Sequence, residues 1–192
     1  MIIKSCKPFS FTGERLIFIQ IFTMPKPAAG TYPVYFDNYI SKVEETDVIT
    51  AIENQQPVVD SFFNSISEEK SMFAYAPGKW TLKELLQHII DAERIFCFRA
   101  LCFARAEKQS LPGFEEDDYA RNSNANARSW ESLLKEMKVV RQSSRLLYES
   151  FSNEMLESSG LANNNPTSVN AIGFILVGHL THHVNIIKER YL

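Results

Sequence analysis

The stretch "GKWTLKELLQHIIDAERIFCFRALCFARAE", from Gly78 to Glu107, decides the fold. Thr81 is followed three residues later by Glu84, which is the pattern of a capping box, so a helix is predicted to begin at Thr81. At about 100° per residue, the apolar side chains of this stretch fall within about 80° of His88. The sequence therefore predicts one helix from Thr81 to about Ala104, with His88 on its buried face. The apolar residues of that face are Leu85, Ala92, Ile95, Phe96 and Phe103.

Two further segments, beginning near Thr46 and Ser129, space the residues of one face alternately by three and four positions, as amphipathic helices do, and a last helix is predicted to follow Ser168. No segment shows the strand-like alternation of apolar and polar residues between turns. We therefore predict an all-α fold, a four-helix bundle with little or no sheet and with a long connection between its second and third helices. That connection, about residues 107–128, is too polar for a fifth buried helix and is of the length that forms lids or site walls. The predicted helices span about residues 46–66, 81–104, 129–151 and 169–190.

The composition bounds the class of protein. The 192 residues are enough for one hydrophobic core, and 45% of them are apolar. A net charge of -3 with a pI near 5.8 gives no basic surface for nucleic acid, so no nucleic-acid partner is expected. Cys6, Cys97 and Cys102 are odd in number and form no CxxC motif, which favours free thiols in a reducing cytoplasm.

The first 24 residues raise the question of targeting. The apolar run Leu16–Phe22 is too short to span a bilayer, and it lacks the small residues of a signal-peptide cleavage site. We interpret residues 1–24 as an N-terminal extension outside the core, with Met24 as the natural start; the alternative is a genuine N-terminal arm. Residues 25–192 then form the bundle domain, and no membrane association is expected.

The histidines point to a metal site. His179 and His183 lie one turn apart in the middle of the predicted buried face of the last helix, whereas His182 lies at its edge. Two histidines at i and i+4 can bind one metal ion, and His88 faces the same core. The alternative is that each buried imidazole finds its own carbonyl or carboxylate. Three inward histidines on two helices favour a shared ion, because each unsatisfied ring nitrogen costs about 1–3 kcal/mol.

Three neutral histidines leave an open coordination position, the pattern of catalytic metal sites. A water or a thiol at that position becomes a nucleophile near neutral pH. Asp91, about 60° around the helix from His88, is the candidate general base or supporting carboxylate, and Glu93 is expected to be structural. Leu180 stands where the HExxH proteases have their base, which argues against peptide hydrolysis by their mechanism. Three arginines, Arg94, Arg99 and Arg105, are interpreted as a solvated helix face rather than a site for a carboxylate-bearing thiol.

The segments "YAPGKWTLKELLQHIIDAERIFCFRALCFAR", "LPGFEEDDY" and "GHLTHHVNIIKERYL" resemble the DinB-like (DinB/YfiT) family of metal-binding four-helix proteins over about residues 25–192. The resemblance implies that His88, His179 and His183 bind a divalent metal ion. It also implies a homodimer. The family includes S-transferases that use bacillithiol or mycothiol, a thiol-dependent isomerase, and members described as metal-dependent hydrolases.

Two hypotheses follow for the function. The first is a metal-dependent enzyme, a thiol S-transferase or a hydrolase acting on a small molecule, with a low-molecular-weight thiol as the expected partner. The second is a non-catalytic, stress-related protein that binds a metal or a ligand. An open cleft beside the ion favours the enzyme, and a site sealed by Phe96, Leu176 and the long connection favours the second. Imidazole ligands suit zinc, nickel, iron and copper alike.

Overall fold

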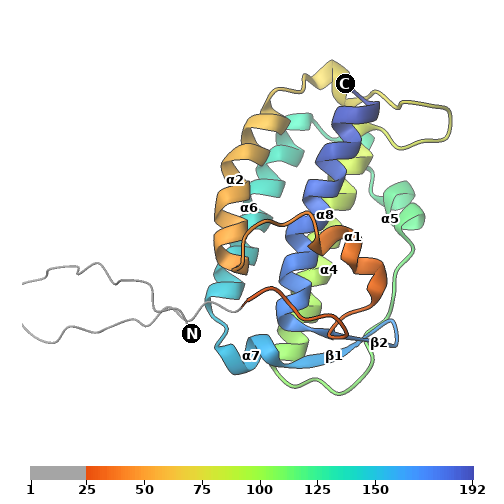
Figure 1. Cartoon of the computed structure of the whole chain (residues 1–192). Coiled ribbons are helices and arrows are strands. Elements are labelled where there is room, and N and C mark those ends of the chain that lie inside the picture. The colour runs from red at the N-terminus through yellow and green to blue at the C-terminus, as the bar shows by residue number, and fades with distance from the viewer. Residues whose placement is uncertain (1–24) are drawn as a thin grey trace, which may run out of the picture.

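Four long helices form the bundle predicted from the sequence (Figure 1). The computed structural model describes residues 25–192, and the interpretation of residues 1–24 as an extension lies outside this range. The four helices are α2 (Val48–Asn64), α4 (Leu82–Ala104), α6 (Trp130–Glu149) and α8 (Val169–Arg190). Each begins within a few residues of its predicted start, and α4 ends at the predicted Ala104.

The helix starts are fixed by side-chain caps, as the sequence predicts. The Thr81 hydroxyl accepts a hydrogen bond from the Glu84 backbone N–H at 3.1 Å, and the Glu84 carboxylate accepts one from the Thr81 N–H at 2.8 Å. Asp47 caps α2 by accepting from the Thr50 N–H at 2.8 Å. Such a cap is worth about 1 kcal/mol. These bonds set where each helix begins, and therefore where His88 falls along α4.

Helix α8 lies at the centre of the molecule and packs against α4, α2 and the short helix α1 (Asp37–Ile40). Its residues from Val169 to Leu180 are buried on every side. Two apolar clusters fill the core, one containing Phe96 and Leu176 and the other Leu85 and Leu180. On α4, His88 lies between Leu85 and Phe96. On α8, His179 lies between Leu176 and Leu180. The two histidines therefore lie at the boundary between the two apolar clusters.

A buried polar network ties the four helices together. Arg141 of α6 and Glu93 of α4 form an ion pair at 3.2 Å, both almost fully buried, and the Ser144 hydroxyl donates to Glu93 at 2.6 Å. Arg141 also donates to Gln55 of α2, whose amide donates in turn to the Val177 carbonyl of α8 at 2.8 Å. A buried charge needs such partners. Glu93 thus has the structural role that the sequence indicated.

A small antiparallel hairpin was not predicted as a distinct element. Strands β1 (Ser159–Ala162) and β2 (Asn165–Ser168) pair through a two-residue turn at Asn163 and Asn164, whose φ angles are 50° and 60°. Asparagine tolerates positive φ, and this turn matches the twist of a hairpin. Four-residue strands show too little alternation to be read from the sequence. The remaining elements are short: η1 (Val34–Phe36), α3 (Glu68–Ser71), α5 (Glu116–Asn122), η2 (Ala125–Ala127) and α7 (Asn153–Glu157).

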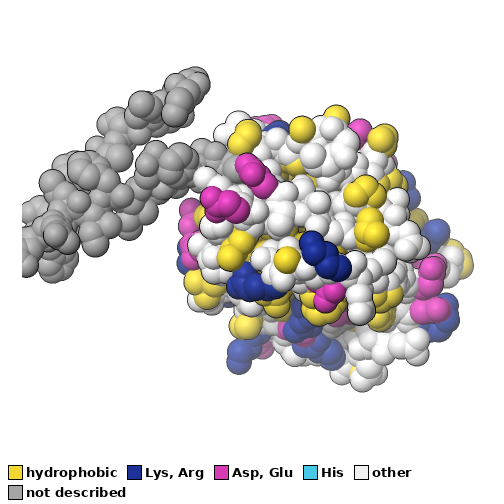
Figure 2. All heavy atoms as spheres, turned by 90° about the horizontal axis from the view of Figure 1, so that it is seen from below, with side chains coloured by type: hydrophobic (Ala, Val, Ile, Leu, Met, Phe, Trp, Pro, Cys, Tyr) yellow, Lys and Arg dark blue, Asp and Glu magenta, His cyan; other side chains and the backbone are white. Residues whose placement is uncertain are grey.

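The surface shows mixed charge at the end of the molecule formed by α7 and the hairpin. Figure 2 views this end and shows Lys and Arg side chains interspersed with Asp and Glu, without a large patch of one sign. Within residues 25–192, no helix is long and apolar enough to cross a membrane.

Candidate metal centre

Three histidine rings converge between α4 and α8. The Nε2 atom of His88 lies 3.2 Å from Nε2 of His179 and 3.2 Å from Nε2 of His183, and the latter two are 3.0 Å apart. His88 comes from the middle of α4, and the other two lie one turn apart on α8. The rings therefore meet as the helical positions predicted, and each offers the same ring nitrogen to a common point.

This arrangement suits a cation better than a set of hydrogen bonds. A neutral imidazole nitrogen carries either one hydrogen or one lone pair, so three Nε2 atoms in mutual contact cannot satisfy all three contacts with protons. Three nitrogens bound to one zinc ion at about 2.0–2.1 Å lie about 3.3 Å from one another, close to the separations seen here. Among residues 25–192, His88, His179 and His183 form the one such group of potential metal ligands. The donor set therefore fits a divalent ion.

The rings are neutral at physiological pH, as metal binding requires. Burial lowers the pKa of His88 to about 4, although the nearby Asp117 carboxylate opposes this shift. Burial, together with the neighbouring histidines, holds the pKa values of His179 and His183 well below the usual range. Each Nε2 can therefore present a lone pair without first losing a proton.

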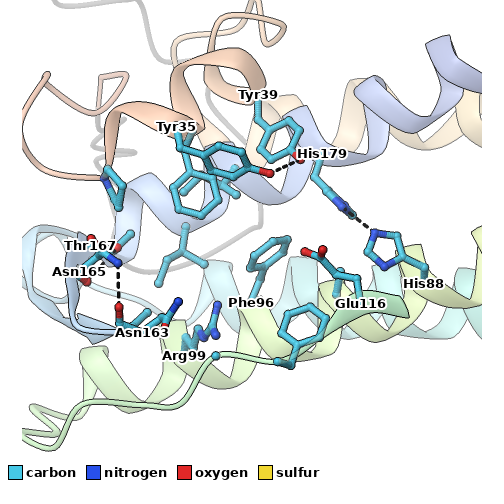
Figure 3. A pocket seen from close by; sticks show the side chains of 18 residues that line it. Tyr35, Tyr39, His88, Phe96, Arg99, Glu116, Asn163, Asn165, Thr167 and His179 are labelled. Carbon is cyan, nitrogen blue, oxygen red and sulfur yellow. Dashed lines mark hydrogen bonds between the residues drawn. The ribbon is translucent and has the colours of Figure 1, made fainter. Parts of the chain in front are cut away.

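A pocket of about 360 Å³ opens beside the histidines. His88 and His179 form one end of it, and Tyr39, Phe96 and Glu116 line its walls (Figure 3). The Glu116 carboxylate points into the pocket in this view, and burial with the nearby Glu115 and Asp117 raises its pKa. The volume falls within the range of small-molecule sites. His88 and His179 are therefore accessible to a small molecule from this pocket rather than sealed.

The pocket walls come from segments outside the four long helices. Helix α1 crosses α8 at Gly178, and the Tyr39 ring contacts that of His179 with centroids 5.4 Å apart. The connection after α4 pairs with the hairpin, because the Leu111 N–H donates to the Leu161 carbonyl at 2.8 Å. Glu116, at the start of α5, lies further along the same connection. The long connection thus forms a wall of the site, as its length indicated.

A second cavity, of about 290 Å³, lies on the His183 side of the cluster. Trp80, Asp117 and Tyr191 contribute to its lining, and the Trp80 ring lies 5.0 Å from that of His88 between centroids. Helix α5 therefore carries neighbouring carboxylates to two cavities, with Glu116 in the first and Asp117 in the second.

Asp91 does not line either pocket. Its carboxylate accepts a hydrogen bond from Gln87 at 2.9 Å and lies 3.8 Å from the Arg94 guanidinium, on the side of α4 that faces α6. The 60° between Asp91 and His88 turns the carboxylate away from the cluster. The pocket carboxylate is instead Glu116, which was not among the site residues predicted from the sequence. Its acidic run was visible in "LPGFEEDDY", but no sequence signal places α5 against the histidines.

The expectations for the three arginines and for His182 had different outcomes. Arg94 is exposed and pairs with Glu136, as a solvated residue should, and Arg105 is exposed. The same interpretation is wrong for Arg99, which is only 9% exposed and lines the 360 Å³ pocket. Arg99 is turned inward because it lies about 20° from His88 on the helical count. His182 is half-buried against Tyr39, at the edge of the buried face as predicted.

The fold and the site define a helical bundle that presents three converging histidines to an open pocket. Residues 51–187 match the DinB superfamily, so the chain belongs to this family, as the resemblance indicated. Among solved structures, the chain is similar to YfiT from Bacillus subtilis, described as a probable metal-dependent hydrolase with an unusual four-helix bundle topology. The two share 14% sequence identity and a TM-score of 0.61, over 86% of this chain and 91% of YfiT. At that identity the likeness establishes the fold alone. No curated protein matches the sequence.

Proposed function

We propose that this protein is a metal-dependent enzyme that acts on a small molecule, with a divalent ion held by His88, His179 and His183. The observation that carries the proposal is the 360 Å³ pocket that reaches two of the three histidines. A purely structural ion needs no such access, since structural sites are closed. The non-catalytic alternative predicts a sealed site, and the open pocket argues against it.

The chain's own residues supply the remaining chemistry. When bound, a divalent ion acts as a Lewis acid and lowers the pKa of a water or thiol at its open position. Glu116 is the candidate proton carrier, because its carboxylate lines the pocket and its raised pKa suits proton transfer nearer neutral pH. The aromatic rings of Tyr39 and Phe96 reduce the access of water to the reacting groups. This role for Glu116 takes the place of the one considered for Asp91.

Hydrolysis is the reaction that we propose first. The structurally similar YfiT is described as a probable metal-dependent hydrolase, and a three-histidine site with an open position is suited to activating water. Thiol S-transfer is the second candidate, and it requires a thiol from outside the chain. Cys97 is unsuited to that task, because burial raises its pKa to about 12.

The experiment begins with metal analysis of untagged protein, since affinity resins supply nickel. The protein is then assayed against ester, amide and lactone substrates, and separately against electrophiles with a low-molecular-weight thiol, each with and without chelator. We expect about one divalent ion per chain and a chelator-sensitive activity in one of the two panels. Protein that takes up no zinc, nickel or iron would contradict the proposal.

We also propose that the protein is a cytoplasmic homodimer. The proposal rests on the family resemblance and, for the compartment, on the free thiols of Cys97 and Cys102. Sedimentation equilibrium at micromolar concentration should give twice the chain mass of 22.0 kDa. A mass of one chain would overturn the dimer and leave the proposed reaction unaffected.

A further inference from the structure

Arg99 is a buried cation that faces the same pocket as the histidines. It lies eleven residues after His88 on α4, which corresponds to a rise of about 16 Å along the helix axis. Ala92 and Phe96 lie between them on the same face and also line the pocket. Figure 3 shows Arg99 beside Asn163 at one end of the pocket, with His88 and Glu116 at the other. The pocket therefore has a basic end and a histidine end.

The Arg99 guanidinium has no carboxylate partner among residues 25–192. Its Nη2 atom donates to the Pro112 carbonyl at 2.8 Å, and no ion pair joins Arg99 to any described acidic residue. The other buried arginine, Arg141, is paired with Glu93. A guanidinium has five N–H donors and stays charged at neutral pH, even though burial lowers the pKa of Arg99. A charge removed from water in this way calls for an anionic partner.

We propose that Arg99 binds a carboxylate of the substrate, so that this protein acts on a small carboxylic acid whose reactive group lies at the histidine end of the pocket. The inference rests on the proposed function and adds the class of its substrate. Arg99 is the one cation lining the pocket within the described residues, which matches a single negative charge. A phosphate dianion would bring two negative charges to that one cation. The planar guanidinium fork suits a carboxylate in a bidentate arrangement.

The neighbours of Arg99 suit the same group. Asn163, Asn165 and Thr167 of the hairpin line this end of the pocket and offer amide and hydroxyl hydrogen bonds. Gly113 brings the connection against the Asn163 side chain, where a β-carbon would come within 3.1 Å of Asn163 Cγ. The basic end is thus built by three separate segments, which are α4, the connection and the hairpin. The middle of the pocket is apolar at Ala92 and Phe96, so the substrate chain between its two ends should be apolar.

A pair of probes that differ only in charge tests the inference. Each probe carries a hydroxamate, which chelates the ion, and an alkyl chain of three to six methylenes that ends in a carboxylate or in the matching primary amide. Binding to zinc-loaded protein is measured by calorimetry. At the chain length that fits, we expect the carboxylate to bind about 10- to 100-fold more tightly than the amide, the usual worth of a hydrogen bond to a charged group.

Variants assign this preference to Arg99. Arg99→Gln should abolish the preference for the carboxylate without changing zinc content, and Arg99→Lys should restore part of it. Arg94→Gln, on the exposed face of the same helix, should retain the full preference. Circular dichroism checks that each variant is folded. Equal affinity for the two probes in the wild-type protein, or a preference that survives Arg99→Gln, would overturn the inference.

Metal binding and carboxylate binding can be tested independently of each other. If the protein takes up no ion, the proposed function fails, and hexanoate is then compared with hexanamide on the metal-free protein. A preference for hexanoate that requires Arg99 would keep the carboxylate site, and its absence would refute that site as well.

Discussion

The backbone carbonyl of Tyr39 occupies the space that a side chain at Gly178 would need. This contact lets α1 lie directly on α8, one residue before His179, and sets the Tyr39 ring edge-to-face against the imidazole. A glycine is required here because of the close approach of two backbones, rather than because of its own dihedral angles.

Gly178→Ala should therefore destabilise the protein, although alanine favours helices by up to about 1 kcal/mol over glycine. The added methyl group must displace α1, and overpacking of this kind costs about 1–3 kcal/mol. Urea unfolding measures the loss, and Asn185→Ala on the exposed face of α8 should change stability by less than about 0.5 kcal/mol. A Gly178→Ala protein as stable as the wild type would show that α1 does not pack on α8 in solution.

His183→Ala should remove metal binding while the bundle stays folded. The substitution deletes one of three ligands, whereas the fold depends mainly on the apolar clusters and the Glu93–Arg141 pair. Metal content by mass spectrometry and helicity by circular dichroism measure the two effects. His182→Ala is the matched control and should retain the ion, because its ring packs on Tyr39 outside the cluster. Unfolding of His183→Ala would instead indicate that a metal supports the fold.

Glu116→Gln and Asp91→Asn should separate the two candidate proton carriers. Both changes keep the size of the side chain and remove its charge. Once a substrate is found, Glu116→Gln should reduce turnover by about 10²-fold, the usual worth of positioned proton transfer, with metal content unchanged. Asp91→Asn should have a much smaller effect, because Asp91 is bonded to Gln87 outside the pocket. The reverse order of effects would restore Asp91 as the base.

Cys97 should resist alkylation in the folded protein. Its pKa is raised to about 12 by burial, so only about one thiol in 10⁴ is ionised at pH 8. Because the thiolate is the nucleophile, iodoacetamide should modify Cys97 about 10²-fold more slowly than a free cysteine, and faster as the pH rises. Peptide mapping by mass spectrometry follows the labelling, and unfolding in urea should remove the protection. Rapid labelling of the native protein at pH 8 would contradict the raised pKa.

The helices and the histidine cluster were predictable because both depend on local periodicity. The capping box at Thr81 and Glu84 sets the start of α4, and 100° per residue then turns His88, His179 and His183 inward without any knowledge of how the helices pack. Arg99 lies on the same face by this count. Its burial was not predicted, because arginine is rarely buried and this general tendency was given more weight than the position of Arg99 on the helix.

The remaining parts of the pocket depend on contacts between distant segments. Tyr39 reaches His179 because α1 fits against Gly178, and Glu116 reaches the pocket because the connection pairs with the hairpin through Leu111 and Leu161. Neither contact leaves a periodic signal in one sequence. The Asn163–Asn164 turn carried a turn signal, but its four-residue strands are too short to recognise.

The histidines and much of the pocket wall come from different parts of the fold, and this affects how such a site can change between relatives. All three histidines come from α4 and α8, which the core holds rigidly, whereas Tyr39, Glu116 and Asn163 belong to segments that lie outside the four long helices. Loops tolerate insertion and replacement far better than core helices do. Replacing these outer segments should therefore change which molecule is recognised and leave the histidine cluster unchanged. One helical bundle could in this way act on a series of different reactants.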